Sequence, residues 1–380
     1  MKIQKLQLEN FRNYENYFYE FNSEKNFTIL VGKNGLGKTN FLEALYVLSL
    51  GRSFRTSDFD NLLMWEREFL RCQTEVIDER EEAYKLEFSY SKLPRRKKIF
   101  KRNGLNLRSS KYLGNLLTVL FNPEDLNMLY LEPGLRRKYL DIILCQTDFH
   151  YLEDLGNYKQ ALKQRNALIK GFGGGFGEGF GVGGGGVGVR SGGNFEADLQ
   201  VWDEEMIKYG APVILKRKKL VEFLNGRVSE LYQAIAGGAD RVTVEYQSKI
   251  LKPLSDLSLE SQYRDELFNR HHRDLLRRQT TAGPHRDDLK FYINGKDILG
   301  SASRGEFRTL LLALKLCEIE YIKSVSGESP ILLLDDVFSE LDLDRQKFLI
   351  ESIFSCQTII TTTDLSGLEE ILEKSEVVRM

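Results

Sequence analysis

The chain has 380 residues, of which 42% are hydrophobic and 29% are charged. This balance is typical of a folded soluble protein and excludes a disordered, collagen-like or membrane-embedded chain. The 54 basic and 55 acidic residues leave a net charge of −1, so any binding of nucleic acid must come from local clusters of charge. At about 100–200 residues per domain, the length predicts two domains.

The four cysteines lie far apart in the sequence, which predicts reduced, buried thiols instead of a disulfide framework or a zinc site. They are Cys72, Cys145, Cys317 and Cys356. Residues 1–9 interleave charged with apolar side chains and offer no apolar core of a signal peptide, so we expect no secretion. No stretch approaches about 18 uninterrupted apolar residues, and we expect a cytoplasmic protein that does not enter a membrane.

The first 50 residues predict strands followed by a helix. Residues 17–21 alternate as in a strand, Phe27–Val31 is a compact apolar strand, and apolar residues recur at helical spacing between 41 and 48. Between that strand and that helix, Gly32–Thr39 reads GKNGLGKT and matches the phosphate-binding pattern G-x-x-x-x-G-K-[ST]. In such a loop, backbone N–H groups face a phosphate chain, Lys38 reaches the β- and γ-phosphates, and the Thr39 hydroxyl coordinates Mg²⁺.

Residues 85–111 contain ten basic residues and one acidic residue. Turn residues Asn103 and Gly104 within this stretch favour a hairpin. Its charge could follow DNA phosphates, which would make binding strongly dependent on salt. The alternative is a solvated edge hairpin whose charges prevent unwanted strand pairing.

The middle of the chain, from about 126 to 275, is mainly helical in pattern. Its basic runs 216–219 and 270–273 are interpreted first as solvated helix faces and second as DNA contacts. Within it, Gly171–Asn194 holds 14 of the 32 glycines. We expect this glycine-rich run to form a flexible loop, because it offers too little apolar surface to offset the backbone entropy lost on ordering.

In the last third, Ser301–Glu306 opens a long apolar helix predicted over Phe307–Ile322. A small S-x-G-E turn at a helix N-terminus offers a hydroxyl and free N–H groups to an anion, although Ser303 taken alone is better explained as an N-cap.

A buried strand at Ile331–Leu334 then ends in two carboxylates. Asp335 is placed to hold Mg²⁺, and Asp336 is placed to orient or deprotonate an attacking water. A helix over 345–354 and a strand over 358–361 complete an alternating pattern, which predicts a layered α/β fold.

Lys38 and Asp335 are 297 positions apart, so one nucleotide site must be assembled from both ends of the chain. We therefore expect a head domain, lobe I, formed by residues 1–125 and 276–380. The inserted, mainly helical lobe II spans 126–275 and contains the loop 171–194. Small GTPases and nucleotide kinases do not need so large an insertion.

The order of these motifs, followed by Ser339–Asp342 (SELD), resembles the ABC-type ATPase head of SMC proteins and, more narrowly, the RecF family of bacterial recombination mediators. The resemblance covers nearly the whole chain except the glycine-rich run. Supporting stretches are Asn10–Tyr14, Gly32–Ala44, Gly51–Thr56, Phe121–Leu126 and Gly283–Leu289.

This resemblance implies a head that dimerises on ATP, with Ser303 contacting the γ-phosphate held by the other subunit and Arg12 sensing that phosphate or the base. The implied catalytic residues are Lys38, Ser303 and Asp336, and the implied metal ligands are Thr39 and Asp335. The implied nucleotide-binding residues are Gly32, Lys33, Asn34, Gly35, Leu36, Gly37, Lys38, Thr39, Asn40, Arg12, Ser303 and Gly305. Asp336 replaces the usual glutamate and Thr361–Thr363 replaces a switch histidine, so slow, DNA-dependent hydrolysis is expected.

The resemblance also implies function and partners: DNA repair and replication in the SOS response, with binding to single-stranded, double-stranded or gapped DNA. RecR and RecO are the implied partners, and RecA is an indirect one. Two alternatives are weighed. An ABC-transporter subunit is disfavoured by the missing switch histidine and the helical insertion. An SMC-like structural ATPase is disfavoured because no long heptad run could build a coiled-coil arm.

Overall fold

A five-stranded parallel sheet joins the two ends of the chain in the computed structural model, which describes residues 1–172, 195–252 and 256–380. Its strands, in spatial order, are β14 (Ser375–Arg379), β3 (Phe27–Val31), β13 (Thr358–Thr362), β12 (Ile331–Asp335) and β8 (Thr118–Phe121). Because β3 and β12 both end at the same edge of this sheet, residues from the two ends of the chain meet there.

A second sheet is antiparallel and contains only N-terminal residues. Its order is β2 (Tyr14–Glu20), β1 (Lys2–Phe11), β4 (Phe69–Ile77), β5 (Ala83–Ser91), β6 (Lys97–Arg102) and β7 (Leu105–Leu107). Helix α1 (Lys38–Leu50) contacts strands of both sheets, and every residue from Phe41 to Leu50 is buried. A helix that is covered on all sides in this way holds the two sheets together.

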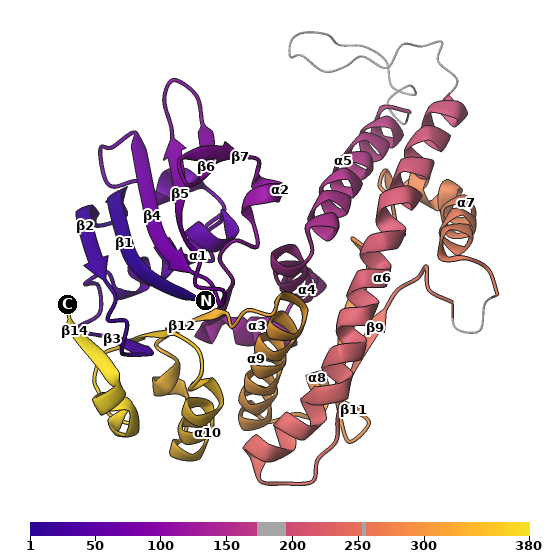
Figure 1. Ribbon diagram of the computed structural model, residues 1–380. Helices are drawn as coiled ribbons and strands as arrows, with labels where there is room; N and C mark the ends of the chain where they lie inside the picture. Colours follow the sequence, from indigo (N-terminus) through magenta and orange to yellow (C-terminus); the bar gives the residue numbers. More distant parts are fainter. Residues whose placement is uncertain (173–194, 253–255) are drawn as a thin grey trace.

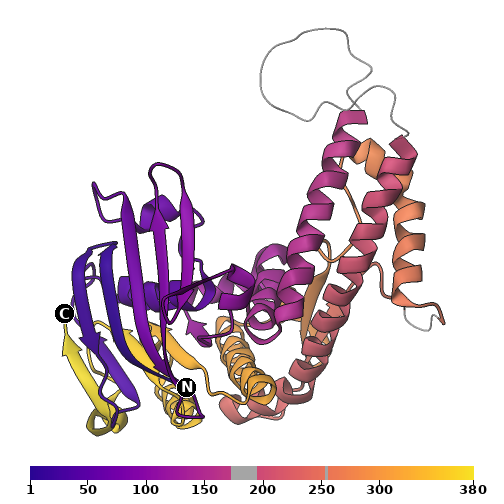
Figure 2. The same ribbon diagram turned by 45° about the horizontal axis from the view of Figure 1, so that its top comes forward.

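Long helices form the other part of the molecule (Figures 1 and 2). Helices α5 (Phe149–Phe172) and α6 (Phe195–Ala236) lie side by side and extend away from the sheets, with α7 (Leu259–Arg277) against α6. A small sheet pairs β9 (Val242–Gln247) with β10 (Asp288–Ile293), and β10 with β11 (Lys296–Asp297). Position 275 is the predicted end of lobe II, so this sheet combines a strand from each predicted lobe.

The remaining elements connect these layers. They are η1 (Phe59–Leu62), α2 (Ser109–Tyr112), η2 (Pro123–Leu126), α3 (Asn127–Tyr130), α4 (Pro133–Thr147), α8 (Ile298–Ser301), α9 (Arg304–Ser326), η3 (Val337–Glu340), α10 (Leu343–Ile353) and η4 (Glu369–Lys374). No helix in the described ranges is both long enough and apolar enough to cross a membrane.

The predicted α/β fold and most predicted elements are confirmed. The helix expected at 307–322 is longer, because the Ser303 side chain caps it at one end and Gly327 ends it at φ 74°. The helix expected at 345–354 begins earlier, because Asp342 accepts a hydrogen bond from the Arg345 N–H at 3.0 Å. All four cysteines are free thiols; Cys145 is half-buried and the others are buried. Most of the glycine-rich run, residues 173–194, lies outside the described residues.

Candidate nucleotide-binding site

The predicted phosphate loop leaves the end of β3 and enters α1. Gly37 adopts φ 105°, and a Cβ at this position would lie 2.4 Å from the Asn13 amide nitrogen. Only glycine fits there, for both conformational and steric reasons. The Tyr14 hydroxyl donates to the Gly37 carbonyl at 3.1 Å, so the turn between β1 and β2 supports the loop from behind.

Lys38 is buried where the loop meets the helix. Its Nζ donates to the backbone carbonyls of Gly32 and, at 2.9 Å, Lys33. The ammonium therefore lies across the inside of the loop, where it can exchange these carbonyls for phosphate oxygens.

The carboxylate of Asp335 lies against the start of α1. Its Oδ1 accepts hydrogen bonds from the Thr39 hydroxyl at 2.9 Å and from the Thr361 hydroxyl at 2.8 Å. A hydroxyl and a carboxylate held together are oxygen donors of the kind that Mg²⁺ prefers. The donor set of Thr39 and Asp335 therefore fits this ion.

Asp336 has an unusual environment for a carboxylate. Its backbone is left-handed, with φ 53°, and its Oδ1 is buried without a hydrogen-bond partner among the described residues. Burial raises the pKa of Asp336, and the neighbouring charge of Asp335 raises it further. A strained carboxylate with one unpaired oxygen and a raised pKa is suited to accept a proton.

These residues line a cavity of about 550 Å³. Its walls include several residues that motif reasoning did not assign to the site, namely Arg55, Asn122, Pro123, Glu124 and Thr361. Arg55 donates to the Asn40 side chain at 2.8 Å. These residues belong to stretches that the sequence analysis singled out, namely Gly51–Thr56, Phe121–Leu126 and Thr361–Thr363. That they line the same cavity as the phosphate loop is known only from the fold.

Comparison with known proteins agrees with this geometry. Residues 2–380 match the family described as RecF/RecN/SMC N terminal domain. The chain is 37% identical over 377 residues to the DNA replication and repair protein RecF of Streptococcus pyogenes serotype M49 (strain NZ131), covering 98% of this chain and 95% of that protein. The chain belongs to the RecF family.

Solved structures of RecF show the same fold. The recombination mediator protein RecF-ATPrS in the RecFOR pathway has a TM-score of 0.86 at 31% identity, covering 100% of this chain and 96% of that one. For RecF-ATP the TM-score is 0.84 at 33% identity, covering 96% and 92%. A Smc head domain from Pyrococcus furiosus, bound to the C-terminal domain of ScpA, has a TM-score of 0.52 at 16% identity, covering 99% and 92%. These likenesses confirm the ABC-type head fold.

Six residues that the RecF resemblance linked to the nucleotide do not line the cavity of their own chain, namely Gly32, Lys33, Leu36, Gly305, Arg12 and Ser303. The last two make other contacts. Arg12 donates through Nε and Nη2 to the buried carboxylate of Glu43, at 2.8 Å each. Ser303 is exposed at the start of α9, where its hydroxyl accepts from the Glu306 N–H at 3.3 Å and Glu306 accepts from the Ser303 N–H at 2.7 Å. The predicted N-cap is therefore confirmed, whereas a contact of either residue with nucleotide stays a prediction.

The predicted basic hairpin is present, with Asn103 at φ 49° and Gly104 at φ 80° in the turn between β6 and β7. Much of its charge is already paired. Arg96 binds Asp60 at 2.6 Å, Lys101 binds Glu87 at 2.8 Å, and the Lys98 ammonium lies over the Phe59 ring. Arg95 and Lys97, in contrast, are exposed and have no ion-pair partner among the described residues.

The interpretation of 216–219 as one solvated face was wrong for Arg217. Its side chain is 3% exposed and donates to Asp141 at 2.7 Å and to the Pro284 carbonyl at 2.7 Å. Successive residues of a helix point about 100° apart, so a run of four basic residues cannot share one face. Arg217 is a core residue of the helical part.

Proposed function

We propose that this chain is an ATP- and Mg²⁺-binding protein of DNA replication and repair that dimerises on ATP and thereby holds DNA. In this proposal it helps to load RecA at gaps, with RecO and RecR as partners. The observation that carries the proposal is the contact between Thr39 and Asp335 at the wall of the phosphate-loop cavity. The names of the RecF relatives, including an ATP-bound structure in the RecFOR pathway, support it.

In this proposal, different residues of the site bind the phosphates, hold Mg²⁺ and accept a proton. The N–H groups of the loop and of the α1 N-terminus bind phosphate oxygens, and Lys38 adds a positive charge. Thr39 and Asp335 would hold Mg²⁺, which neutralises developing charge on the phosphates. Asp336 accepts the proton of the attacking water. Its side chain is one methylene shorter than glutamate, which favours slow turnover and a long-lived dimer.

The position of Ser303 supports the proposed dimerisation. This residue lies outside the cavity of its own chain, and in the proposal it completes the site of another subunit. In the proposed dimer, each nucleotide lies between one subunit's phosphate loop and the other subunit's α9 N-terminus, where free N–H groups favour an anion.

Two surfaces could contact DNA phosphates. One is the connection between β5 and β6, which contains Arg95 and leads to Lys97 at the start of β6. The other is in the helical part, where Lys249 and Arg286 line one cavity. Burial lowers the pKa of Lys249, and repulsion from Arg270, Arg273 and Arg286 lowers it further, while Glu266, the ion-pair partner of Arg270, offsets part of this effect. Two cations that line one cavity suit a polyanion.

Mixed dimers test the shared site. Lys38→Ala and Ser303→Arg should each abolish ATP hydrolysis, because every site in either homodimer carries one defect. In a mixed dimer both defects fall in one site and the other site is intact. Random pairing makes about half of the dimers mixed, so hydrolysis should recover to roughly a quarter of the parent rate.

Melting temperatures of both variants check that Ser303→Arg has not merely removed the N-cap. The same mixture is assayed for ATP-dependent dimers, since strong coupling between the sites could suppress turnover alone. Recovery of neither hydrolysis nor dimers would reject the shared site.

A further inference from the structure

Strand β9 is an edge strand of the small sheet, and helix α6 packs along its free side. In an antiparallel pair, the backbone groups of alternate residues point away from the neighbouring strand. Val244 directs both of its groups to α6: its N–H donates to the Asn225 side chain and its carbonyl accepts from it, each at 2.6 Å. Val242 and Tyr246, the next residues in this alternation, therefore point toward α6 as well.

The cover that α6 gives to this edge ends at Tyr246. Ser229 accepts the Val242 N–H at 3.1 Å, and Asn225 lies one turn earlier in α6. One further turn toward the N-terminus brings Val221, whose side chain can neither donate nor accept a hydrogen bond. The Tyr246 N–H and carbonyl have no hydrogen-bond partner within residues 1–172, 195–252 and 256–380. Unpaired groups at a sheet edge are a template for another strand.

A cavity of about 890 Å³ lies beside this unpaired stretch. Val221 and Asn225 belong to its α6 wall, and residues 243–249 form the facing wall. We call this cavity the α6–β9 groove. Its volume is that of a ligand-binding pocket, and the exposed edge of a sheet admits an extended peptide as an added strand.

The α6–β9 groove has an excess of unpaired positive charge. Its three carboxylates are already bonded: Glu222 pairs with Lys218, Glu245 accepts from the Tyr292 hydroxyl and Asp288 pairs with Arg136. Lys249, Lys252 and Arg286 also line the groove, and none of them has an ion-pair partner in the part of the chain that the structure describes. Three free cations favour a partner that brings negative charge.

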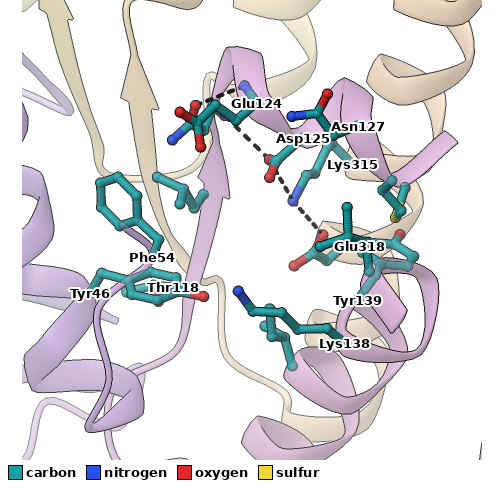
Figure 3. Close-up of a pocket in the computed structure, with 15 residues that line it drawn as sticks. Tyr46, Phe54, Thr118, Glu124, Asp125, Asn127, Lys138, Tyr139, Lys315 and Glu318 are labelled. Carbon is teal, nitrogen blue, oxygen red and sulfur yellow. Dashed lines mark hydrogen bonds and ion pairs between the residues drawn. The ribbon is translucent and has the colours of Figure 1, made fainter. Parts of the chain in front are cut away.

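Lys315 of α9 shows the opposite arrangement, in which a cation beside a cavity is neutralised within the chain. This cavity has a volume of about 180 Å³. Figure 3 shows the Lys315 ammonium between two carboxylates, Asp125 at 3.3 Å and Glu318 at 3.2 Å. The free cations of the α6–β9 groove have no such carboxylates beside them, so their counter-charge must come from outside the chain.

From the unpaired edge and the free cations we propose that the α6–β9 groove binds an extended, acidic segment of a partner protein as a strand added beside Tyr246. The backbone of this segment donates to the Tyr246 carbonyl and accepts from the Tyr246 N–H. Its carboxylates pair with Lys249, Lys252 and Arg286. This binding goes beyond the proposed function and requires neither ATP nor the dimer.

DNA is the competing ligand, because Lys249 and Arg286 also belong to the second DNA surface proposed above. A phosphodiester can accept the Tyr246 N–H, but it has no donor for the Tyr246 carbonyl. A peptide backbone supplies both a donor and an acceptor. The edge of β9 therefore favours the peptide.

A synthetic peptide tests the strand addition on the full chain without nucleotide. The probe alternates valine with aspartate over about ten residues, which is long enough to span the groove at about 3.3 Å per residue. Fluorescence anisotropy of the labelled peptide should show micromolar binding. Hydrogen exchange at the Tyr246 N–H should slow by at least about tenfold in the complex, whereas the Val244 N–H, which is already bonded, should change little.

N-methylation of the probe separates main-chain pairing from charge. One version carries methyl groups on all valine nitrogens, and another carries them on all aspartate nitrogens. An added strand directs only one of these two sets of N–H groups toward β9. One version should therefore lose at least about tenfold in affinity, while the other binds within about threefold of the parent peptide.

Charge reversal tests the cations. Lys249→Glu with Lys252→Glu should weaken binding of the aspartate peptide by at least about tenfold and should permit binding of a valine–lysine peptide. Both lysines are exposed, so the variant should fold, which its melting temperature checks. Lys219→Glu is the matched control, since Lys219 is an exposed lysine of α6 that does not line the groove. It should bind the aspartate peptide like the parent.

Several results would overturn the proposal. Loss of binding in both methylated peptides, or in neither, would exclude an added strand. Unchanged affinity of the charge-reversed variant would exclude an acidic partner. Binding of duplex DNA to the groove without binding of the peptide would reject the peptide and assign the groove to DNA.

Discussion

The Thr39 hydroxyl donates a hydrogen bond of 2.9 Å to the carboxylate of Asp335, which lies 296 positions away in the chain. The two residues meet because β3 and β12 are parallel strands of one sheet, separated only by β13. The proposed ATP site exists only when both ends of the chain have folded together.

Lys38→Ala should abolish ATP-dependent dimerisation while the protein stays folded. The ammonium is the charge that the loop directs inward, and its loss leaves only backbone groups for the phosphates. Lys163→Ala is the control, since it removes an exposed amine from α5, outside the loop. Mass in solution with and without ATP measures the effect. Equal dimerisation of the Lys38 variant and the parent would contradict the assignment of the loop.

Reversing charge at the hairpin should weaken DNA binding mainly through Arg95 and Lys97. Each phosphate contact adds about 0.9 to the slope of log affinity against log salt on duplex DNA. Arg95→Glu with Lys97→Glu should therefore flatten the slope by about 2. Adding Arg96→Glu and Lys98→Glu should change it little further, since Arg96 is ion-paired and Lys98 covers Phe59. An unchanged slope in both variants would exclude the hairpin as a DNA contact.

Gly283→Ala should destabilise the fold strongly. Gly283 has φ 127°, and a Cβ would lie 2.3 Å from the Tyr263 hydroxyl and 2.5 Å from the Tyr158 hydroxyl. We expect a loss of more than about 2 kcal/mol in the free energy of unfolding. Gly295→Ala, at φ 75° with open space around it, should cost only about 1 kcal/mol. Urea unfolding compares the two, and equal losses would show that the tyrosine contacts do not matter.

Stability should fall in acid through His285. Its Nε2 donates to the Thr280 carbonyl at 3.2 Å, so its Nδ1 accepts from the Tyr158 hydroxyl at 2.5 Å. Burial lowers the pKa of His285 from 6.5 to about 4. The unfolded chain therefore binds a proton between these values and the folded chain does not, which destabilises the fold as pH falls from 6.5 toward 4.

His285→Gln removes the titrating group and keeps a donor and an acceptor. Relative to its own stability at pH 7.5, the variant should lose on the order of 2 kcal/mol less than the parent by pH 4.5. Urea unfolding across this range measures the difference. The comparison cancels the opposite contribution of Asp287, whose pKa burial raises to about 6. Parallel pH profiles would show that His285 protonates in place.

The sequence by itself determined the α/β class, the phosphate loop and the strand that ends in Asp335. These features are local: a glycine-rich loop needs glycine where φ is positive, as at Gly37, and a buried strand needs an apolar run, as in Ile331–Leu334. A pattern of this kind can be recognised without knowing what surrounds it. The N-cap at Ser303 could also be predicted from the sequence, because a capping side chain accepts its hydrogen bond from an N–H group in the first turn of the same helix.

Only the tertiary structure decided which partner each basic side chain contacts. It paired Arg96 with Asp60, buried Arg217 against Asp141 and paired Lys315 with Asp125. Each of these partners is distant in sequence, and whether a basic residue is solvated, buried or free to meet DNA depends on the carboxylates that folding brings near it. The sequence shows which residues are charged, whereas the fold determines which of these charges are paired.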